Sequence, residues 1–166
     1  MEDLDRNGML LKIKQEVDPH LEMAEIQRRA YSTAAPAILF EKVKGSPFPA
    51  ISNLFGKRDR ADFLFRKSLK KVKKVVGVKA DPPNALKNPF RNWTVPFTAL
   101  RALPKKVRTG PVFAHETTID QLPQIVSWPD DGGAFITLPQ VFTMDPDAPS
   151  NLMKSNVGMY RIQLGG

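Results

Sequence analysis

The sequence predicts an α+β protein in which a connector rich in proline joins two structural units. Three observations support this prediction. Amphipathic helical and strand-like segments alternate over the first 80 residues. Prolines then recur too often for long elements to persist, at Pro82, Pro83, Pro89, Pro96, Pro104 and Pro111. Finally, two strand-like segments flank a polar turn that contains proline, which predicts an antiparallel pair.

The first unit is predicted to begin with a strand, a helix and a second strand. Residues 9–17 alternate between apolar and charged side chains from Leu11 onward, as a half-buried strand does. Asp18 is a favourable N-cap, and an apolar stripe at helical spacing follows it as far as Ala30. Residues 38–40 form a short apolar run that predicts a buried strand, and residues 50–54 predict another extended segment.

A Lys-rich helix is predicted in the middle of the chain, from Arg60 to Gly77. Its apolar stripe is wide enough to be core, and it consists of Phe65, Leu69, Val72 and Val76. Residues 57–108 carry 16 Lys or Arg against 3 Asp or Glu, so the basic character of the protein is concentrated there. Aromatic residues do not interleave with the lysines. A solvated helix surface is therefore favoured over a face that binds nucleic acid or membrane.

A last strand is predicted from Ser155 to Leu164, paired with one from Ala134 to Thr143. Alternation places Val157, Met159 and Arg161 on one face of this last strand. A guanidinium beside apolar neighbours is costly to bury unless it is paired. The pattern leaves two interpretations open: a strand whose polar groups contact a ligand, and an exposed edge strand with a surface Arg.

Several kinds of chemistry find no support in the residues. The chain has no Cys, so it offers no disulfide, thiolate metal site or Cys nucleophile. His20 and His115 lie far apart without a second ligand at metal spacing. The acidic residues Asp130, Asp131, Asp145 and Asp147 are more typical of turns than of cation sites. The first residues do not resemble a signal peptide and the apolar runs are short, so we expect a cytoplasmic protein.

Four segments, taken in order, resemble a known family. They are VDPHLEMAEIQRRA (17–30), PAILFEKVKGSPFPAISNLFGKRDR (36–60), LPQIVSWPDDGGAFITLPQVFT (122–143) and NVGMYRIQL (156–164). The family is the UbiD-type decarboxylases, which use prenylated FMN. The resemblance is greatest to the branch that acts on polyprenyl-hydroxybenzoates in ubiquinone synthesis, and it extends over nearly the whole chain.

The resemblance implies a fold in which an N-terminal α/β unit precedes a split β-barrel related to flavin reductases. We therefore expect residues 1–110 to form an N-terminal α/β domain with its connector. Residues 111–166 would form the opening strands of the barrel, which would be truncated because members of the family are much longer. An incomplete barrel would leave apolar side chains such as Phe142 and Met159 exposed or self-associating.

The resemblance also implies roles for residues of the last strand. Asn156 would ligate the divalent metal ion that binds the cofactor phosphate, typically manganese. Potassium is the other candidate ion. Met159, Tyr160 and Arg161 would line the prenylated flavin. Arg161 would also be the Arg of a catalytic acid–Arg–acid trio, orienting a carboxylate and stabilising charge as carbon dioxide leaves.

The implied activity is the non-oxidative decarboxylation of an aromatic or α,β-unsaturated carboxylic acid. The two catalytic acids and a metal-binding Glu of the family have no counterpart in this chain, so we predict that the polypeptide alone is inactive. The family also implies a homo-oligomer, and a lipophilic substrate would bring the protein to a membrane surface.

Two alternative functions remain open. The chain could be a non-catalytic binding or scaffold module of the same fold, pairing with a polypeptide that supplies the rest of the barrel. It could instead be a basic protein that associates with nucleic acid or membrane through Arg66 to Lys74, although the resemblance predicts no nucleic-acid partner. Binding of flavin together with manganese would separate this last alternative from the others.

Overall fold

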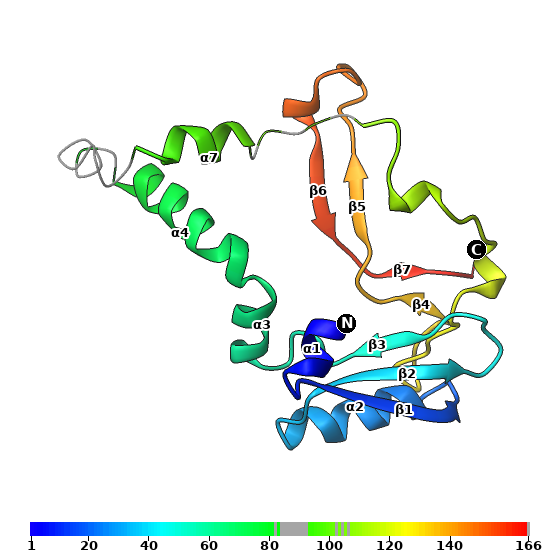
Figure 1. Cartoon of the computed structure of the whole chain (residues 1–166). Coiled ribbons are helices and arrows are strands. Elements are labelled where there is room, and N and C mark those ends of the chain that lie inside the picture. Colours follow the sequence, from blue (N-terminus) through cyan, green and yellow to red (C-terminus); the bar gives the residue numbers. More distant parts are fainter. Residues whose placement is uncertain (82, 84–92, 102, 104, 106, 166) are drawn as a thin grey trace. The chain divides into compact units, whose positions relative to one another are not determined.

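The computed structural model describes residues 1–81, 83, 93–101, 103, 105 and 107–165 (Figure 1). The chain divides into two compact units, Met1–Lys57 with Thr109–Gly166, and Arg58–Arg108. The mixture of helices and strands confirms the predicted combination of both element types. The predicted division into domains at residues 110 and 111 stays a prediction.

The first unit is built on a three-stranded sheet in the order β1–β2–β3. β1 (Leu10–Val17) runs parallel to β2 (Ala37–Val43), and β2 pairs antiparallel with β3 (Ala50–Ser52). α2 (Glu22–Ser32) lies between β1 and β2 in the chain and forms the crossover that a parallel pair requires. Each strand coincides with a segment that the sequence predicts to be extended.

α2 packs on the sheet and forms the core of this unit with it (Figure 1). Met23 and Ala30 of the helix are buried in one cluster with Ile38 and Phe40 of β2, and Phe40 is completely inaccessible to solvent. Removing such side chains from water is the main favourable contribution to folding. The apolar stripe predicted for the helix is therefore confirmed as its buried face.

α2 begins later than the sequence predicts. The predicted N-cap is Asp18, whereas the helix starts at Glu22 and its N-cap is Leu21, at φ 67°. Asp18 Oδ1 instead accepts a hydrogen bond from the backbone N–H of His20 at 2.8 Å, and Glu22 Oε2 accepts one from the backbone N–H of Asp18 at 2.7 Å. The Asp18 side chain thus stabilises a local turn, which is the conformation that competes with N-capping for such residues.

A short helix that the sequence pattern does not reveal, α1 (Glu2–Arg6), precedes β1. Its Leu4 is 1% exposed and is one of the most deeply buried side chains of the described residues. Five residues are too few to display helical periodicity, so tertiary packing and not local pattern selects this helix.

The second unit contains α3 (Arg58–Leu64), α4 (Arg66–Ala80) and α7 (Val95–Arg101). The Nζ of Lys74 in α4 donates a hydrogen bond to Oγ1 of Thr94, just before α7, at 3.0 Å. α7 agrees with the short helices expected in the Pro-rich connector, part of which lies outside the described residues. Across the described ranges, no helix has the length and apolar character needed to cross a membrane.

The prediction of a single Lys-rich helix with a buried stripe is wrong. The helix is interrupted at Phe65, and α4 continues past Gly77. A glycine inside a helix costs about 1 kcal/mol and does not by itself end it. α4 has no buried residue, and Val72 and Val76 are 54% and 57% exposed. The apolar stripe is therefore a surface feature of this unit.

Four short strands lie near the end of the chain. β4 (Phe135–Ile136) pairs antiparallel with β7 (Ile162–Gln163), and β5 (Gln140–Thr143) pairs antiparallel with β6 (Asn156–Met159). Figure 1 shows these pairs following one another along a single hairpin. The predicted antiparallel pairing is confirmed.

Both long strands predicted here are interrupted at the same level of the hairpin. One breaks at residues 137–139 and the other at residues 160–161. The backbone N–H of Tyr160 donates to the carbonyl of Pro139 across the break at 3.1 Å. Pro139 has no N–H to return, which limits ladder pairing at this point. The described residues form no closed barrel, and the split barrel stays a prediction.

The segment that leads into β4 is attached to the start of α2 by backbone hydrogen bonds. Val126 N–H donates to the Pro19 carbonyl at 3.1 Å, and Leu21 N–H donates to the Val126 carbonyl at 2.9 Å. Ile125 packs against the core cluster. These contacts anchor the turn at residues 127–133. The described part of the chain also contains the 3₁₀ turns η1 (Pro111–Phe113), η2 (Ile119–Gln121) and η3 (Leu152–Lys154).

Candidate functional site

Arg161 lies between β6 and β7, where the hairpin bends. Its Nη1 donates to Oδ1 of Asp131 at 2.9 Å, and its Nη2 donates to Oδ2 of the same carboxylate. The guanidinium carbon lies 3.7 Å from the centre of the Phe135 ring, in a cation–π contact. Two carboxylate oxygens and an aromatic ring thus fix a side chain that keeps 38% of its surface exposed.

Asp131 is also held by the turn to which it belongs. Its Oδ2 accepts hydrogen bonds from the backbone N–H groups of Ser127 and Trp128, both at 3.1 Å. Its own backbone N–H donates to the Trp128 carbonyl at 3.1 Å. The Asp131 side chain is 8% exposed, a burial that a carboxylate tolerates when it is paired and hydrogen-bonded. The structure therefore confirms a turn at this position.

Both members of the pair stay charged at ordinary pH. The hydrogen bond from Arg161 holds the pKa of the Asp131 carboxyl below its usual value, while burial opposes this effect and the backbone N–H groups reinforce it. In turn, the hydrogen bond to Asp131 raises the pKa of the Arg161 guanidinium. Arg161 is consequently a fixed cation and hydrogen-bond donor, and not an acid that releases a proton.

The two glycines after Asp131 bring the turn against the last strand. Gln163 Nε2 donates to the Gly132 carbonyl at 2.7 Å. Gly133 has a φ of 139°, a conformation that side-chain-bearing residues rarely adopt. Arg161 and Gln163 are two residues apart, and both contact the same turn. The turn therefore binds the strand on both sides of Ile162.

The other predicted site residues lie along β6 and just after it. Asn156 is exposed at the start of β6, opposite Thr143. Met159 and Tyr160 are 62% and 50% exposed. A Cβ at Gly158 would come within 2.6 Å of the Tyr160 ring, so this ring lies against the glycine. The strand thus presents an amide, two largely apolar side chains and, through Arg161, a fixed cation.

Sequence reasoning missed Asp131 as the partner of Arg161. The two residues are separated by 30 positions, and they meet because Phe135 pairs with Gln163 across β4 and β7. The sequence pattern does not specify that register. The available signal was the cost of an unpaired Arg beside apolar residues, which predicts a nearby anion without identifying it.

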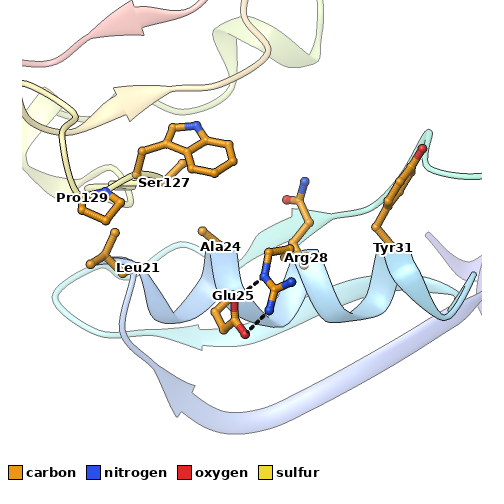
Figure 2. Close-up of a pocket in the computed structure, with 9 residues that line it drawn as sticks. Leu21, Ala24, Glu25, Arg28, Tyr31, Ser127 and Pro129 are labelled. Atoms are coloured by element: carbon orange, nitrogen blue, oxygen red, sulfur yellow. Dashed lines mark hydrogen bonds and ion pairs between the residues drawn. The ribbon is translucent and has the colours of Figure 1, made fainter.

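A separate hollow of about 430 Å³ lies beside α2 (Figure 2). Leu21 and Tyr31 are among the residues on its helix side, and residues 127–129 contribute to its lining. Arg28 donates from Nε and Nη2 to the Glu25 carboxylate at 2.7 and 2.8 Å. Together with Arg29, this lowers the pKa of Glu25 to about 2. None of the four predicted site residues lines the hollow, although Ser127 and Trp128, whose N–H groups bind Asp131, contribute to its wall.

Comparison with known proteins assigns both ends of the chain. Residues 1–78 match the 3-octaprenyl-4-hydroxybenzoate carboxy-lyase N-terminal domain, and residues 105–166 match the Rift-related domain of the same carboxy-lyase. A protein of Chlamydia pneumoniae that is named as a subunit of 4-hydroxybenzoate decarboxylase is 37% identical over 157 residues, which are 93% of this chain and 26% of that protein.

Solved structures show the same similarity. The vanillic acid decarboxylase ShVdcCD of Sedimentibacter hydroxybenzoicus, in its closed form, has a TM-score of 0.72 and 26% identity over 99% of this chain and 34% of that one. The UbiD-class enzyme HmfF of Pelotomaculum thermopropionicum, in complex with FMN, has a TM-score of 0.66 and 25% identity over 98% of this chain and 33% of that one.

The two matched domains define the class: proteins that contain the N-terminal and Rift-related domains of a UbiD-type carboxy-lyase. The chain belongs to the UbiD family of decarboxylases. It spans about a quarter of the length of the curated relatives it matches and about a third of the solved structures.

Proposed function

We propose that the chain supplies one side of the cofactor site of a decarboxylase that uses prenylated FMN. The substrate would be an aromatic or α,β-unsaturated carboxylic acid, such as a polyprenyl-hydroxybenzoate in ubiquinone synthesis. The observation that carries this proposal is the fixed Arg161 beside the exposed side chains of Met159 and Tyr160. A relative named as part of a 4-hydroxybenzoate decarboxylase and a structure solved with FMN support it.

In this proposal Arg161 lines the flavin and binds the substrate carboxylate. Asp131 accepts one N–H from each terminal nitrogen, so one N–H on Nη1, one on Nη2 and the Nε–H remain for other acceptors. A fixed cation with these donors orients a carboxylate and stabilises the charge that changes as carbon dioxide leaves. Because the pKa of Arg161 is raised, this residue does not supply the proton that replaces carbon dioxide. Since the two catalytic acids of the family have no counterpart in this chain, we propose that the chain alone is inactive.

Asn156, Met159 and Tyr160 would contact the cofactor and its metal. Among the described residues no partner hydrogen-bonds the Asn156 side chain, and its carbonyl oxygen suits a hard cation such as Mn²⁺, with K⁺ as the other candidate. No cluster of three or more His, Cys, Asp or Glu occurs in the described ranges, so further ligands would come from the cofactor phosphate and from outside these residues. Met159 and Tyr160 would pack on the prenylated flavin, which supplies the electron-accepting chemistry of decarboxylation.

We also propose that the whole protein is a cytoplasmic homo-oligomer that meets a lipophilic substrate at a membrane surface. Phe142 and Val157 are 49% and 62% exposed on the paired strands β5 and β6, which supports their burial in a larger assembly. Light scattering after size exclusion tests this proposal on the chain. A monodisperse monomer with hairpin amides protected from hydrogen exchange would contradict it.

Flavin binding tests the cofactor assignment directly. FMN and prenylated FMN are titrated into the protein with Mn²⁺ present, and flavin fluorescence reports binding. We expect saturable binding that Arg161→Ala weakens by about tenfold or more, because a hydrogen bond to a charged group contributes on this scale.

Arg28→Ala is the matched control for this titration. It also removes an Arg that binds a carboxylate through two nitrogens, but from α2. We expect its flavin affinity to equal that of the wild type. Equal affinity for all three proteins would refute the assignment of Arg161, and release of carbon dioxide from a panel of aromatic and unsaturated acids would refute the proposed inactivity.

A further inference from the structure

The turn at residues 127–133 is held by several contacts that do not involve Arg161. Its start is anchored to α2 through the Val126 hydrogen bonds, and Asp131 closes it through the N–H groups of Ser127 and Trp128. Oδ2 of the carboxylate is thus held by two backbone N–H groups in addition to its contact with Arg161. An Arg that binds both oxygens of a fixed carboxylate has its own plane fixed as well, because the fork geometry is rigid.

We propose that Asp131 is the positioning residue of Arg161, holding the guanidinium so that its remaining N–H groups face the flavin and the substrate carboxylate. This inference rests on the proposed function, in which Arg161 lines the flavin and binds that carboxylate. Asp131 touches neither substrate nor cofactor in this proposal, and it acts through Arg161.

The pairing orients Arg161 and leaves some of its N–H groups available to other acceptors. Asp131 uses two of the five guanidinium N–H groups, and the side chain remains 38% exposed. Phe135 covers the guanidinium on one side at 3.7 Å, which restricts the plane further. A long side chain ordered in advance loses less conformational entropy when a ligand binds, so pre-orientation raises affinity.

The neighbouring Asp130 provides a matched control. It is exposed, whereas the Asp131 side chain is 8% exposed. Asp130→Asn and Asp131→Asn remove the same charge from adjacent positions of one turn. A difference between these two variants therefore reports the contacts of the Asp131 carboxylate and not a change in net charge, and the Arg161 signals report the contact with Arg161 itself.

The experiment uses the 166-residue chain labelled with ¹⁵N. Side-chain N–H signals of Arg161 are recorded by NMR, and FMN with Mn²⁺ is titrated into each protein. We expect separate, slowly exchanging Arg161 signals in the wild type and in Asp130→Asn, and averaged signals in Asp131→Asn. We also expect Asp131→Asn to weaken flavin binding by about tenfold, as loss of an outer-shell partner does, and Asp130→Asn to change it less than about twofold.

Each outcome bears on a defined claim. Averaged Arg161 signals in the wild type overturn the inference without any variant, even if Asp131→Asn fails to fold. Ordered Arg161 signals that survive in Asp131→Asn, or equal flavin affinity for the wild type and Asp131→Asn, also overturn it. Absence of flavin binding by the wild type overturns the proposed function and with it the positioning role, whereas the Arg161 signals still report whether the pair forms.

Discussion

The sheet covered by α2 and the hairpin of β4 to β7 belong to one compact unit, but different forces hold them. The first has a cluster of buried side chains that includes Phe40 at 0% and Ile38 at 1% exposed. In the second, no apolar residue among the described residues from 107 to 165 is buried. The hairpin is ordered instead by two short ladders and by the contacts that Arg161 and Gln163 make with one turn.

This contrast separates a part that is stable through its own packing from a part that presents a surface. Apolar burial is non-directional and tolerates small shifts, whereas charged and hydrogen-bonded contacts place individual groups at defined positions. The region with little buried area is also the region with the oriented guanidinium. Side chains left exposed there, such as Met159 and Tyr160, are available for contact with a ligand or another part of the protein.

The largest expected effect is the loss of the Phe40 side chain from the sheet. Phe40→Ala should lower the free energy of unfolding by about 4 kcal/mol, because it removes a fully buried aromatic ring and leaves a cavity. Urea unfolding monitored by circular dichroism measures this change.

Phe142→Ala makes the same substitution in the hairpin, where Phe142 is 49% exposed. Its cost should be below about 0.5 kcal/mol, as for surface substitutions in general. Similar costs for the two variants would show that both regions are equally well packed and would remove the contrast.

An intermediate effect is expected at the turn that contacts Arg161. Gly133→Ala should destabilise the turn by about 1 kcal/mol or more, because its φ of 139° is unfavourable for a residue with a Cβ. Hydrogen exchange of the β4 and β7 amides measures the change locally. Gly132→Ala is the control, since its φ is not in that region and its added Cβ would lie 3.4 Å from Gln163 Nε2. Equal exchange rates in the two variants would argue against backbone strain at Gly133.

The smallest effect is expected from the exposed pair on α2. The pKa of Glu25 is depressed in the folded protein, so its pairing with Arg28 and Arg29 stabilises the fold above the usual carboxyl pKa of 4.5 and loses this contribution as the pH falls towards about 2. The pairing of Asp131 with Arg161 also stabilises the fold above the usual carboxyl pKa and loses this contribution as the pH falls, because the pKa of Asp131 is lowered as well. A ¹³C titration of the Glu25 carboxyl should have its midpoint near pH 2.

Glu25→Gln should flatten the acid dependence of stability in that range, and only slightly, because an exposed pair contributes little. A Glu25 midpoint near 4.5 would show that the α2 pair does not persist in solution. The acid dependence of stability would then be expected from the Asp131–Arg161 pair alone.

The two regions also differ in how well the sequence predicts them. The strands near Leu11 and Phe40 and the buried face of α2 follow from alternation and helical spacing, which are local patterns. The start of α2 was misplaced because Asp18 forms a turn with His20 where N-capping of the helix was predicted. The stripe that includes Val72 and Val76 has the spacing of a core helix, but spacing does not specify whether a partner covers it.

For the candidate site, the sequence identified the strand and its Arg but not the carboxylate that binds the Arg. Asn156, Met159, Tyr160 and Arg161 were selected from one contiguous segment, and their roles toward a cofactor stay predictions. The interruption at Tyr160 depends on Pro139 of the opposite strand. A residue 30 positions away completes the contact of Arg161, and no local pattern contains that information.

The sequence by itself determined the strands near Leu11 and Phe40 and the helix between them, the concentration of basic residues in the middle of the chain, and the likeness to the UbiD family. These properties depend on neighbouring residues or on the order of motifs. Tertiary structure alone decided that α4 leaves its apolar stripe exposed and that Asp131 meets Arg161. The reason is physical: burial and ion pairing depend on distances between residues far apart in the chain, and only the register of the folded strands sets those distances.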